Sequence, residues 1–486
     1  MDVGELKQDV LEGRIGVDRL IEIIGVLAEK LEAAEQRIKE LEARFGAPSS
    51  KLKEPFSVEA EEKRQAARGK TKRKKTKPLR RGRISTAEKL AKAQREEDVF
   101  PKGLDPALCW FSHSRPVWRL EDGQAVLVAY QIYRGKKNRY GQIAGVIGRS
   151  EFGIEIVLAV AYQVYVLGLS FDKACALMSF FTSLNLKKAQ ANALMNQLAR
   201  EWESEFETLC RLLGHSAVVY ADETSWSLNS VWAFLSDQVR VLFFGVHKDA
   251  ETLQAILNRE TYSGVLVSDD AAVYQNFTNA QKCWAHLLRK AIKLTLMAPE
   301  NLQYREFTDR LLALYRRALK IKQDRRLSQA GRERNVTRLE NELIDLCPDS
   351  DRWWDESVLD EAEEACRLLV NELMRLLVRN ELFTFVRNAD VEGTNNESER
   401  TLRDSAQARQ TGRANKTLLG ARRQSIIRSV LESLRTQLPC YGLDAVVEEV
   451  QRWWQVGQSC FRDLAECYGI GPPDTSVLET VLPLPS

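Results

Sequence analysis

Several familiar patterns are missing from this sequence, and each absence argues against a class of protein. The nine cysteines include no C-x-x-C pair, which argues against a zinc ribbon or a disulfide framework and favours a reducing compartment. No basic segment followed by an apolar run stands near the start, and the most apolar stretch, residues 153–169, contains Glu155 and Gln163. We therefore expect no membrane partner and a cytoplasmic location.

Acidic residues are absent from one segment, although the whole chain has a net charge of only +3. Every charged residue from Lys63 to Arg83 is Lys or Arg, and such a run repels itself and buries little apolar surface. We expect residues 48–100 to form a basic disordered linker that binds nucleic acid, with a simple solvated connection as the alternative. The candidate contacts here are Lys72, Arg73, Lys74, Lys75, Arg80 and Arg81.

Apolar residues from Val17 to Phe45 recur at alternating steps of three and four. This spacing is typical of a coiled coil. β-Branched residues at heptad position a with leucine at position d favour a coil of two parallel helices. We predict that residues 1–47 form a dimerisation arm and that the protein is a homodimer through residues 17–45. A single amphipathic helix docked on its own domain is the alternative.

The rest of the chain divides into several units, because 486 residues exceed what one core organises and ~150 residues per domain suggests about three. Residues 101–149 are predicted to form a small domain. Residues 150–213 are predicted to be helical, with a break at Gly168 and an N-cap at Ser170. A helix-turn-helix and plain packing of helices both fit this segment.

A sheet is indicated from residue 214 onward. The pattern predicts three antiparallel strands, a helix over 250–257, a fourth strand over 264–269, a short helix over 271–277 and a fifth strand over 281–285. This order is that of a ribonuclease-H-like fold, in which the first and fourth strands are neighbours. We predict a multidomain α/β protein with these further parts: the first part of the catalytic core over 214–294, an all-helical insertion over 295–390, the last catalytic helix with C-terminal helices over 391–470, and a loose tail over 471–486.

Three acidic residues stand at the ends of these elements. Asp222 and Asp269 each end an apolar run, and Glu399 opens a charged helical stretch. Clustered carboxylates repel one another unless a cation offsets their charge, so they predict a hard divalent ion such as Mg²⁺ or Mn²⁺. Two ions about 4 Å apart can serve the attacking and leaving oxygens of a phosphodiester. In this scheme Asp222 bridges both ions, Asp269 holds one and Glu399 holds the other.

Arginine side chains follow Glu399 and are suited to phosphate oxygens. We expect them to contact the DNA backbone, with a solvated basic face as the alternative. The candidates are Arg400, Arg403, Arg409 and Arg413.

Four blocks of sequence resemble a known family: DETSW at 222–226, SDDAAVY at 268–274, CWAHLLRK at 283–290 and NNESERTLR at 395–403. Their content, order and spacing are similar to those of the DDE transposases of the insertion-sequence-66 family. The resemblance implies that Asp222, Asp269 and Glu399 are the metal-binding triad, with Tyr274 favouring Asp269 over Asp270. It also implies a catalytic role for His286, which would contact the scissile phosphate or a metal-bound water, with a hydrogen-bonded structural histidine as the alternative.

One part of the family pattern is not recognisable. The family has a cysteine-paired zinc-finger segment before its helical middle region, but in residues 101–149 Cys109 stands alone near His113. We therefore do not expect zinc there.

These observations predict a transposase of a bacterial insertion sequence. It would cut and join double-stranded DNA at the terminal inverted repeats of the element and at target DNA, in the bacterial nucleoid. The resemblance also implies accessory proteins of the element as partners. Two alternatives stay open: a ribonuclease-H-like nuclease without strand transfer, and a catalytically silent DNA-binding repressor.

Overall fold

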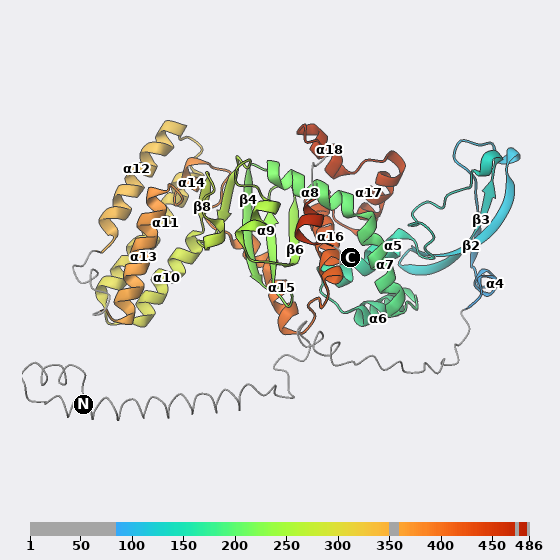
Figure 1. The fold of residues 1–486 in the computed structure, drawn as a ribbon, viewed down its shortest axis with the longest axis horizontal. Coiled ribbons are helices and arrows are strands. Elements are labelled where there is room, and N and C mark those ends of the chain that lie inside the picture. The colour runs from blue at the N-terminus through green and yellow to red at the C-terminus, as the bar shows by residue number, and fades with distance from the viewer. Residues whose placement is uncertain (1–83, 349–358, 472–475, 484–486) are drawn as a thin grey trace, which may run out of the picture. The chain divides into compact units, whose positions relative to one another are not determined.

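The computed structural model describes residues 84–348, 359–471 and 476–483, all within the compact unit Lys72–Ser486. The predicted coiled coil and the basic residues from Lys72 to Arg81 lie outside these ranges. The described part is mixed α/β, with one three-stranded and one five-stranded sheet (Figure 1). Within these ranges, no helix has both the length and the apolar character that a membrane crossing requires.

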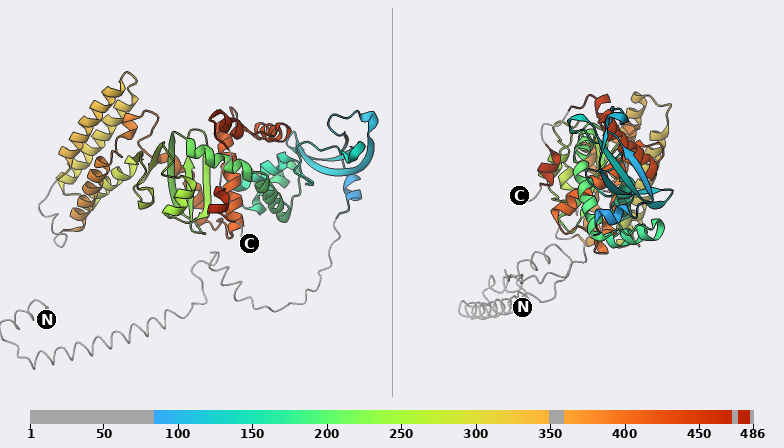
Figure 2. Two further views of the ribbon diagram at one scale, coloured as in Figure 1. Left: turned by 45° about the horizontal axis from the view of Figure 1, so that its top comes forward. Right: turned by 90° about the vertical axis from the view of Figure 1, so that its right-hand side faces the viewer.

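The small sheet has the order β1-β3-β2 and includes a long, curved β2–β3 hairpin, which Figures 1 and 2 show in blue and cyan. Its elements are α4 (Thr86–Leu90), β1 (Arg95–Val99), a 3₁₀ turn (Pro106–Leu108), β2 (Trp110–Glu121), β3 (Gln124–Arg134) and a second 3₁₀ turn (Lys136–Asn138). β1 is parallel to β3, and β2 is antiparallel to it.

This small sheet corrects the predicted extent of the linker. We expected a disordered linker up to residue 100, but α4 and β1 lie inside that range. Ser85 and Glu88 form a reciprocal capping box that starts α4, and β1 gains backbone hydrogen bonds from β3. The disorder predicted from the charge run that ends at Arg83 therefore does not extend into α4 and β1, because a local cap starts the helix and a partner 33 residues away (128 − 95) pairs with the strand.

The segment from 150 to 215 is helical, as predicted. It contains α5 (Ile154–Ala161), a π-helical turn (Tyr162–Val166), α6 (Phe171–Thr182), α7 (Lys188–Glu201) and α8 (Glu203–His215). The predicted N-cap is confirmed, since the Ser170 hydroxyl accepts a hydrogen bond from the Lys173 amide at 3.3 Å. The apolar faces of these helices are buried in the largest hydrophobic cluster of the described chain.

The five-stranded sheet has the order β6-β5-β4-β7-β8. Its strands are β4 (Val218–Ser225), β5 (Ser230–Leu235), β6 (Arg240–Val246), β7 (Val265–Ser268) and β8 (Ala280–Lys282), with α9 (Ala250–Ile256) between β6 and β7. β4, β5 and β6 are antiparallel, while β7 and β8 run parallel to β4. The predicted meander and the pairing of the first strand with the fourth are confirmed.

Two predictions for this region need correction. The fifth strand was expected over 281–285, but β8 ends at Lys282 and a helix begins at Trp284. The short helix expected over 271–277 is only a 3₁₀ turn, Ala272–Tyr274. A short apolar run does not by itself distinguish a strand from the first turn of a buried helix.

Helices cover both faces of this sheet (Figure 2). On one face, Val219 and Leu266 belong to the cluster that includes α8 and α9 residues such as Phe206 and Leu253. On the other face, Val218 and Val267 pack with the helix that follows β8, and Ala233 packs with Leu402. Side chains alternate between faces along a strand, so Asp222 shares the second face with Val218.

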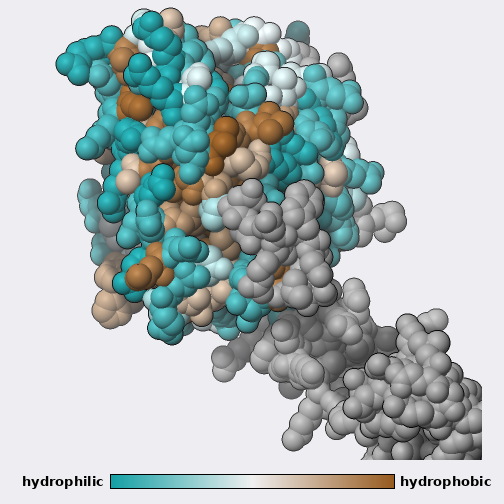
Figure 3. Space-filling view, turned by 90° about the vertical axis from the view of Figure 1, so that its left-hand side faces the viewer, coloured by the Kyte–Doolittle hydropathy of each residue, from teal (hydrophilic) through white to brown (hydrophobic). Residues whose placement is uncertain are grey.

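The predicted insertion is helical and forms a second core. It contains α10 (Trp284–Met297), which starts in the preceding segment, then α11 (Leu302–Gln323), α12 (Gln329–Leu346), α13 (Glu361–Val378) and α14 (Thr384–Arg387). Figure 3 views the side of the molecule on which α11 to α13 lie: apolar side chains form a band between hydrophilic ones. Leu302, Ile344 and Leu368 are exposed apolar residues of these helices.

The C-terminal part is also helical. It contains α15 (Asn396–Gln410), α16 (Leu418–Gln437), α17 (Leu443–Val456), α18 (Cys460–Cys467) and α19 (Val477–Val481). The predicted loose tail over 471–486 is therefore wrong for residues 476–483. Leu478 and Leu482 are buried in the largest cluster, and both of their carbonyls accept hydrogen bonds from Arg422.

The two edges of the five-stranded sheet are covered by side chains that hydrogen-bond to them. Along β6, the hydroxyls of Ser425, Ser429 and Ser433 on α16 accept from the backbone amides of Phe244, Leu242 and Arg240 at 2.8–2.9 Å. A spacing of four keeps the three serines on one helix face. Along β8, the Thr384 hydroxyl donates to Ala280 O at 2.8 Å, and the Lys282 amide donates to Glu381 O at 2.8 Å.

Replacing Ser429 by alanine tests the covering of the β6 edge. The Leu242 amide would lose its acceptor in a buried position, so we expect a loss of about 1–3 kcal/mol in the free energy of unfolding. Denaturant unfolding measures this change. Ser179, an exposed residue of α6, is the matched control, and its replacement by alanine should change stability by less than about 0.5 kcal/mol. Equal effects of the two replacements would show that the serine contact does not stabilise the edge.

Candidate active site

Asp222 and Asp269 occupy matching positions on neighbouring parallel strands. β4 pairs with β7 in a register that matches Val218 with Val265, an offset of 47 residues (265 − 218). Asp222 and Asp269 have the same offset (269 − 222 = 47), so Asp269, directly after β7, continues the register beside Asp222. Parallel neighbours lie ~4.8 Å apart and point to the same face. The structure places Asp222 three residues before the end of β4 rather than at the strand end.

Glu399 reaches this region from α15, which packs on β4 and β5. Asn395, just before the helix, anchors its start: its side-chain amide donates to Ala221 O at 2.7 Å and its backbone amide donates to Cys283 Sγ at 3.2 Å. Ala221 directly precedes Asp222. The anchor therefore fixes the first turn of α15, and Glu399 with it, against the strand that carries Asp222.

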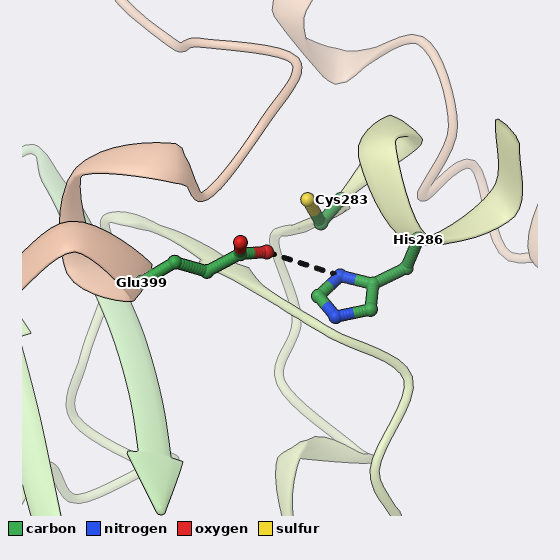
Figure 4. A group of neighbouring side chains, drawn as sticks. All are labelled: Cys283, His286 and Glu399. Atoms are coloured by element: carbon green, nitrogen blue, oxygen red, sulfur yellow. Dashed lines mark ion pairs between the residues drawn. The ribbon is translucent and has the colours of Figure 1, made fainter. Parts of the chain in front are cut away.

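His286 lies in the first turn of α10, which follows β8. The backbone of Cys283 donates to Ser268 O at 2.9 Å, and the backbone of Trp284 donates to Gly393 O at 2.9 Å. These bonds hold the start of α10 between β7 and the segment before α15. As a result, His286 Nδ1 lies 3.7 Å from Glu399 Oε1, and Figure 4 shows the two side chains facing each other.

The electrostatics of the site centre on Asp222. The pKa of Asp222 is raised to about 7, first by burial and then by the nearby carboxylates of Glu223, Asp269 and Glu399. A hydrogen bond from the Glu223 amide to Asp222 Oδ1, 3.0 Å long, opposes this effect only in part. Asp269 and Glu399 thus lie near enough to Asp222 to raise its pKa by repulsion, but the carboxylate oxygens of the three acids do not all lie within 4.8 Å of one another.

Cationic side chains pair with the acids around Asp222. Lys248 forms an ion pair with the buried carboxylate of Glu223, which also accepts a hydrogen bond from the Tyr274 hydroxyl. Arg289 Nη2 lies 2.5 Å from Glu399 Oε1. Within the described residues, Asp222 and Asp269 have no ion-pair partner at their carboxylates. These two side chains are therefore the ones left for a cation from solution.

Asp270 and Asp269 have different environments. Asp270 forms an ion pair with Arg375 of α13. Asp269 instead accepts a hydrogen bond from the Ala271 amide at 3.0 Å, and its backbone carbonyl accepts from Lys282 Nζ at 3.1 Å. The pairing of Asp270 with an arginine agrees with the preference for Asp269 as the ligand.

Several of these residues were missed in the sequence. Glu223, Lys248, Lys282, Arg289 and Arg375 all contact the acidic cluster or its supporting backbone. Lys282 could have been found in the sequence, because a lysine within a short predicted strand of the sheet is unusual and indicates a buried charge with a role. In the structure this side chain is 2% exposed. Lys248 and Arg375 gave no such signal, because only the fold brings them near the acids.

The predicted arginines of the DNA-binding face differ in their contacts. Arg400 and Arg403 are exposed on α15. Arg409 donates to Ser225 O at 2.8 Å and Arg413 donates to Gly168 O at 2.9 Å, so both are partly engaged by backbone carbonyls. Arg422, a basic residue in the same part of the sequence, is buried and pairs with Glu479. Among the described residues, Arg400 and Arg403 are therefore the arginines beside Glu399 on α15 that form no ion pair.

The donor set fits a hard divalent ion. Asp222, Asp269 and Glu399 offer only carboxylate oxygens, which Mg²⁺ and Mn²⁺ prefer. The raised pKa of Asp222 is the expected sign of a carboxylate whose charge lacks a partner.

Fold and site together define a mixed α/β protein with an acidic centre on a mixed sheet, supported by helices that come from distant parts of the chain. The chain belongs to the Transposase IS66 family, whose sequence model matches residues 149–423. The match spans β4 to β8, the helical insertion and α15, and so includes every acid of the centre. Membership identifies the protein as a transposase, an enzyme class that acts on DNA. A search of curated proteins returned no match.

The pKa of Asp222 predicts a pH-dependent stability in the absence of metal. In the folded state Asp222 keeps its proton up to about pH 7, whereas in the unfolded state it loses the proton at pH ~4. The free energy of unfolding therefore falls as pH rises from ~4 to 7, because ionising Asp222 is less favourable in the folded state. Asp222→Asn removes this titration. We expect the variant to match the parent near pH 4 and to exceed it by about 1–3 kcal/mol at pH 8 in chelator.

Denaturant unfolding at a series of pH values measures this difference. Asp270→Asn is the control: it strips Arg375 of its partner, so we expect it to lower stability instead. A difference between Asp222→Asn and the parent that does not grow with pH would contradict the assigned electrostatics.

Proposed function

We propose that this transposase cuts and joins DNA at the ends of a bacterial insertion sequence by two-metal phosphoryl transfer, with Asp222, Asp269 and Glu399 as the metal ligands. The observation that carries the proposal is the parallel β4–β7 register, which sets Asp222 beside Asp269 while the Asn395 anchor delivers Glu399. The strand order β6-β5-β4-β7-β8, with three antiparallel strands followed by two parallel ones, supports a ribonuclease-H-like core.

The chemistry needs two displacements at phosphorus. In the first, water attacks a phosphodiester at the element end, and the P–O bond to the 3′ oxygen breaks to leave a 3′-hydroxyl. In the second, that hydroxyl attacks a phosphodiester of the target, and one P–O bond forms as another breaks. Two Mg²⁺ or Mn²⁺ ions, when bound, would activate the attacking oxygen and offset charge on the phosphoryl group.

The side chains of the chain have distinct parts in this scheme. Asp222, whose carboxylate has no ion-pair partner among the described residues, would be a ligand of both cations, and Asp269 and Glu399 would each hold one of them. His286, 3.7 Å from Glu399, is placed to donate a proton or a hydrogen bond to a phosphate oxygen. Arg289 offsets the Glu399 charge when no cation is present. Arg400 and Arg403 lie beside Glu399 along α15 and bind the DNA backbone.

Other parts of the proposal rest on the sequence. The coiled coil over 17–45 would join two copies, and the basic run that includes Lys72 to Lys75 and Arg80 and Arg81 would bind phosphates without reading sequence. Accessory proteins of the element are further proposed partners.

Neighbouring aspartates provide a matched test of the triad. Asp269→Asn should lower metal-dependent cleavage of DNA that carries the element ends by a factor of about 10² or more, because it removes a ligand. Asp270→Asn should keep at least about a tenth of the parent activity, since Asp270 pairs with Arg375. Product analysis on denaturing gels, with Mg²⁺ or Mn²⁺, gives both cleavage and joining.

Each outcome of that assay separates the candidate functions. Cleavage with joining, lost in Asp269→Asn, supports the transposase mechanism. Cleavage without joining under every condition supports a nuclease. Binding without cleavage by the parent protein supports a repressor, and equal loss in both variants would contradict the assignment of Asp269.

The arginines of α15 make a separate prediction. The double variant Arg400→Gln with Arg403→Gln should weaken DNA binding and reduce the slope of log K against log salt by about 1–2, because each phosphate contact releases a counterion. Fluorescence anisotropy at several salt concentrations measures the slope. Arg325→Gln, an exposed charge at the α11–α12 turn, is the control and should leave the slope unchanged. An unchanged slope in the double variant would show that this helix does not bind the backbone.

A further inference from the structure

A second set of possible metal ligands overlaps the acidic centre. The Sγ of Cys283, a ring nitrogen of His286 and a carboxylate oxygen of Glu399 all lie within 4.8 Å of one another. Among the described residues, no other three Cys, His, Asp or Glu side chains have their ligand atoms this close together. Figure 4 shows the three side chains turned toward a common point from the start of α10 and from α15.

The backbone fixes this trio in place. Cys283 directly precedes α10 and His286 lies three residues later, a spacing that puts both on one side of the first helical turn. The Asn395 amide holds Cys283 Sγ at 3.2 Å and also begins the helix that carries Glu399. The same hydrogen bonds that position Glu399 therefore position the thiol.

The histidine has an open coordination position. His286 Nδ1 is buried and has no hydrogen-bond partner, although it faces Glu399 Oε1 at 3.7 Å. A buried ring nitrogen without a partner is costly, because it has lost water and gained nothing in exchange. A cation between the imidazole and the carboxylate would give the ring nitrogen a partner and would replace Arg289 at Glu399 Oε1.

The buried thiol can be reached from solution. Cys283 is 1% exposed, yet Cys283 and His286 both line a pocket of about 280 Å³ that Asp269 and Lys290 also border. The pocket has room for a cation with a water molecule to complete its coordination.

The donor chemistry selects a different ion from the carboxylate triad. One sulfur, one nitrogen and one oxygen with an open fourth position is a ligand set for Zn²⁺ and similar borderline-soft cations, which bind four ligands at ~2.0–2.3 Å. Mg²⁺ prefers six oxygens and does not compete well for a thiolate. The two sets share one residue, Glu399.

We propose that Cys283, His286 and Glu399 form a site for a thiophilic divalent cation of the Zn²⁺ class, and that its occupation withdraws Glu399 from the catalytic triad. Binding releases the thiol proton to solvent and forms a metal–sulfur bond. The ion thereby blocks Mg²⁺-dependent cleavage. The binding stands independently, whereas the inhibition rests on the proposed function.

Cobalt titration of the full-length protein tests the binding. Co²⁺ in a Cys-His-Glu site should give a thiolate-to-cobalt charge-transfer band in the near ultraviolet and intense visible bands of four-coordinate cobalt, both abolished by added Zn²⁺. Cys283→Ser should lose the charge-transfer band, and His286→Gln should weaken binding by about 10-fold or more. Cys440→Ser, at an exposed cysteine, is the control and should keep the full spectrum. A band that survives in Cys283→Ser would overturn the site.

Inhibition of DNA cleavage tests the shared ligand. At fixed Mg²⁺, Zn²⁺ should inhibit the parent, and the half-inhibitory concentration should rise about 10-fold or more in Cys283→Ser relative to Cys440→Ser. Each variant is compared with its own rate without Zn²⁺. Cleavage that Zn²⁺ inhibits equally in both variants would overturn the proposal.

One variant separates this proposal from the proposed function. Asp222→Asn lacks a triad ligand but keeps the trio, so it should give the same cobalt spectrum as the parent. If the parent protein gives the cobalt spectrum but cleaves no DNA under any condition, the thiophilic site is retained and the catalytic scheme is rejected. If the parent protein cleaves DNA with Mg²⁺ but gives no cobalt–thiolate band, the catalytic scheme is retained and the thiophilic site is rejected.

Discussion

Repulsion between carboxylates is the constraint around which this structure is organised. The β4–β7 register forces Asp222 beside Asp269, and burial with neighbouring charge raises the pKa of Asp222 to about 7. The acids around this pair are each matched with a cation: Glu223 with Lys248, Glu399 with Arg289, and Asp270 with Arg375. The protein thus offsets the charge of the surrounding acids with its own side chains, whereas the two central carboxylates have no ion-pair partner among the described residues.

The insertion is part of this electrostatic arrangement and is not an independent appendage. Arg375 and Glu372 lie on α13, deep in the inserted segment, and they pair with Asp270 and Lys290 at the acidic centre. The Trp284 indole at the start of α10 donates to Leu382 O, which lies between α13 and α14. The long helical segment between Asp269 and Glu399 also begins and ends at one place, because the Trp284 amide donates to Gly393 O at 2.9 Å.

Local patterns made much of the sheet and the acids predictable. The strands β4 to β7 have apolar residues with turn residues between them, and Asp222 and Asp269 interrupt that pattern, so both elements and acids stand out in the sequence. The helix start at Ser170 was predictable for the same reason, because a capping residue acts within one turn.

The errors at β1 and at α19 have a common cause, which is dependence on distant partners. β1 pairs with β3, and α19 buries Leu478 and Leu482 against helices far away in sequence, so neither element is apparent from its own composition. Lys248 and Arg375 reach the site only through the fold. The predicted coiled coil and most of the basic linker lie outside the described residues and stay predictions.

The serines of α16 have a consequence for how copies of this protein can associate. An unpaired edge strand accepts a strand from another molecule, which is a common route to unintended association. Here α16 occupies that position along β6, and residues 381–384 occupy it along β8, so neither edge of the central sheet is open to strand addition. Copies that meet at high local concentration therefore cannot join the edges of their central sheets, and any assembly they form must use other surfaces.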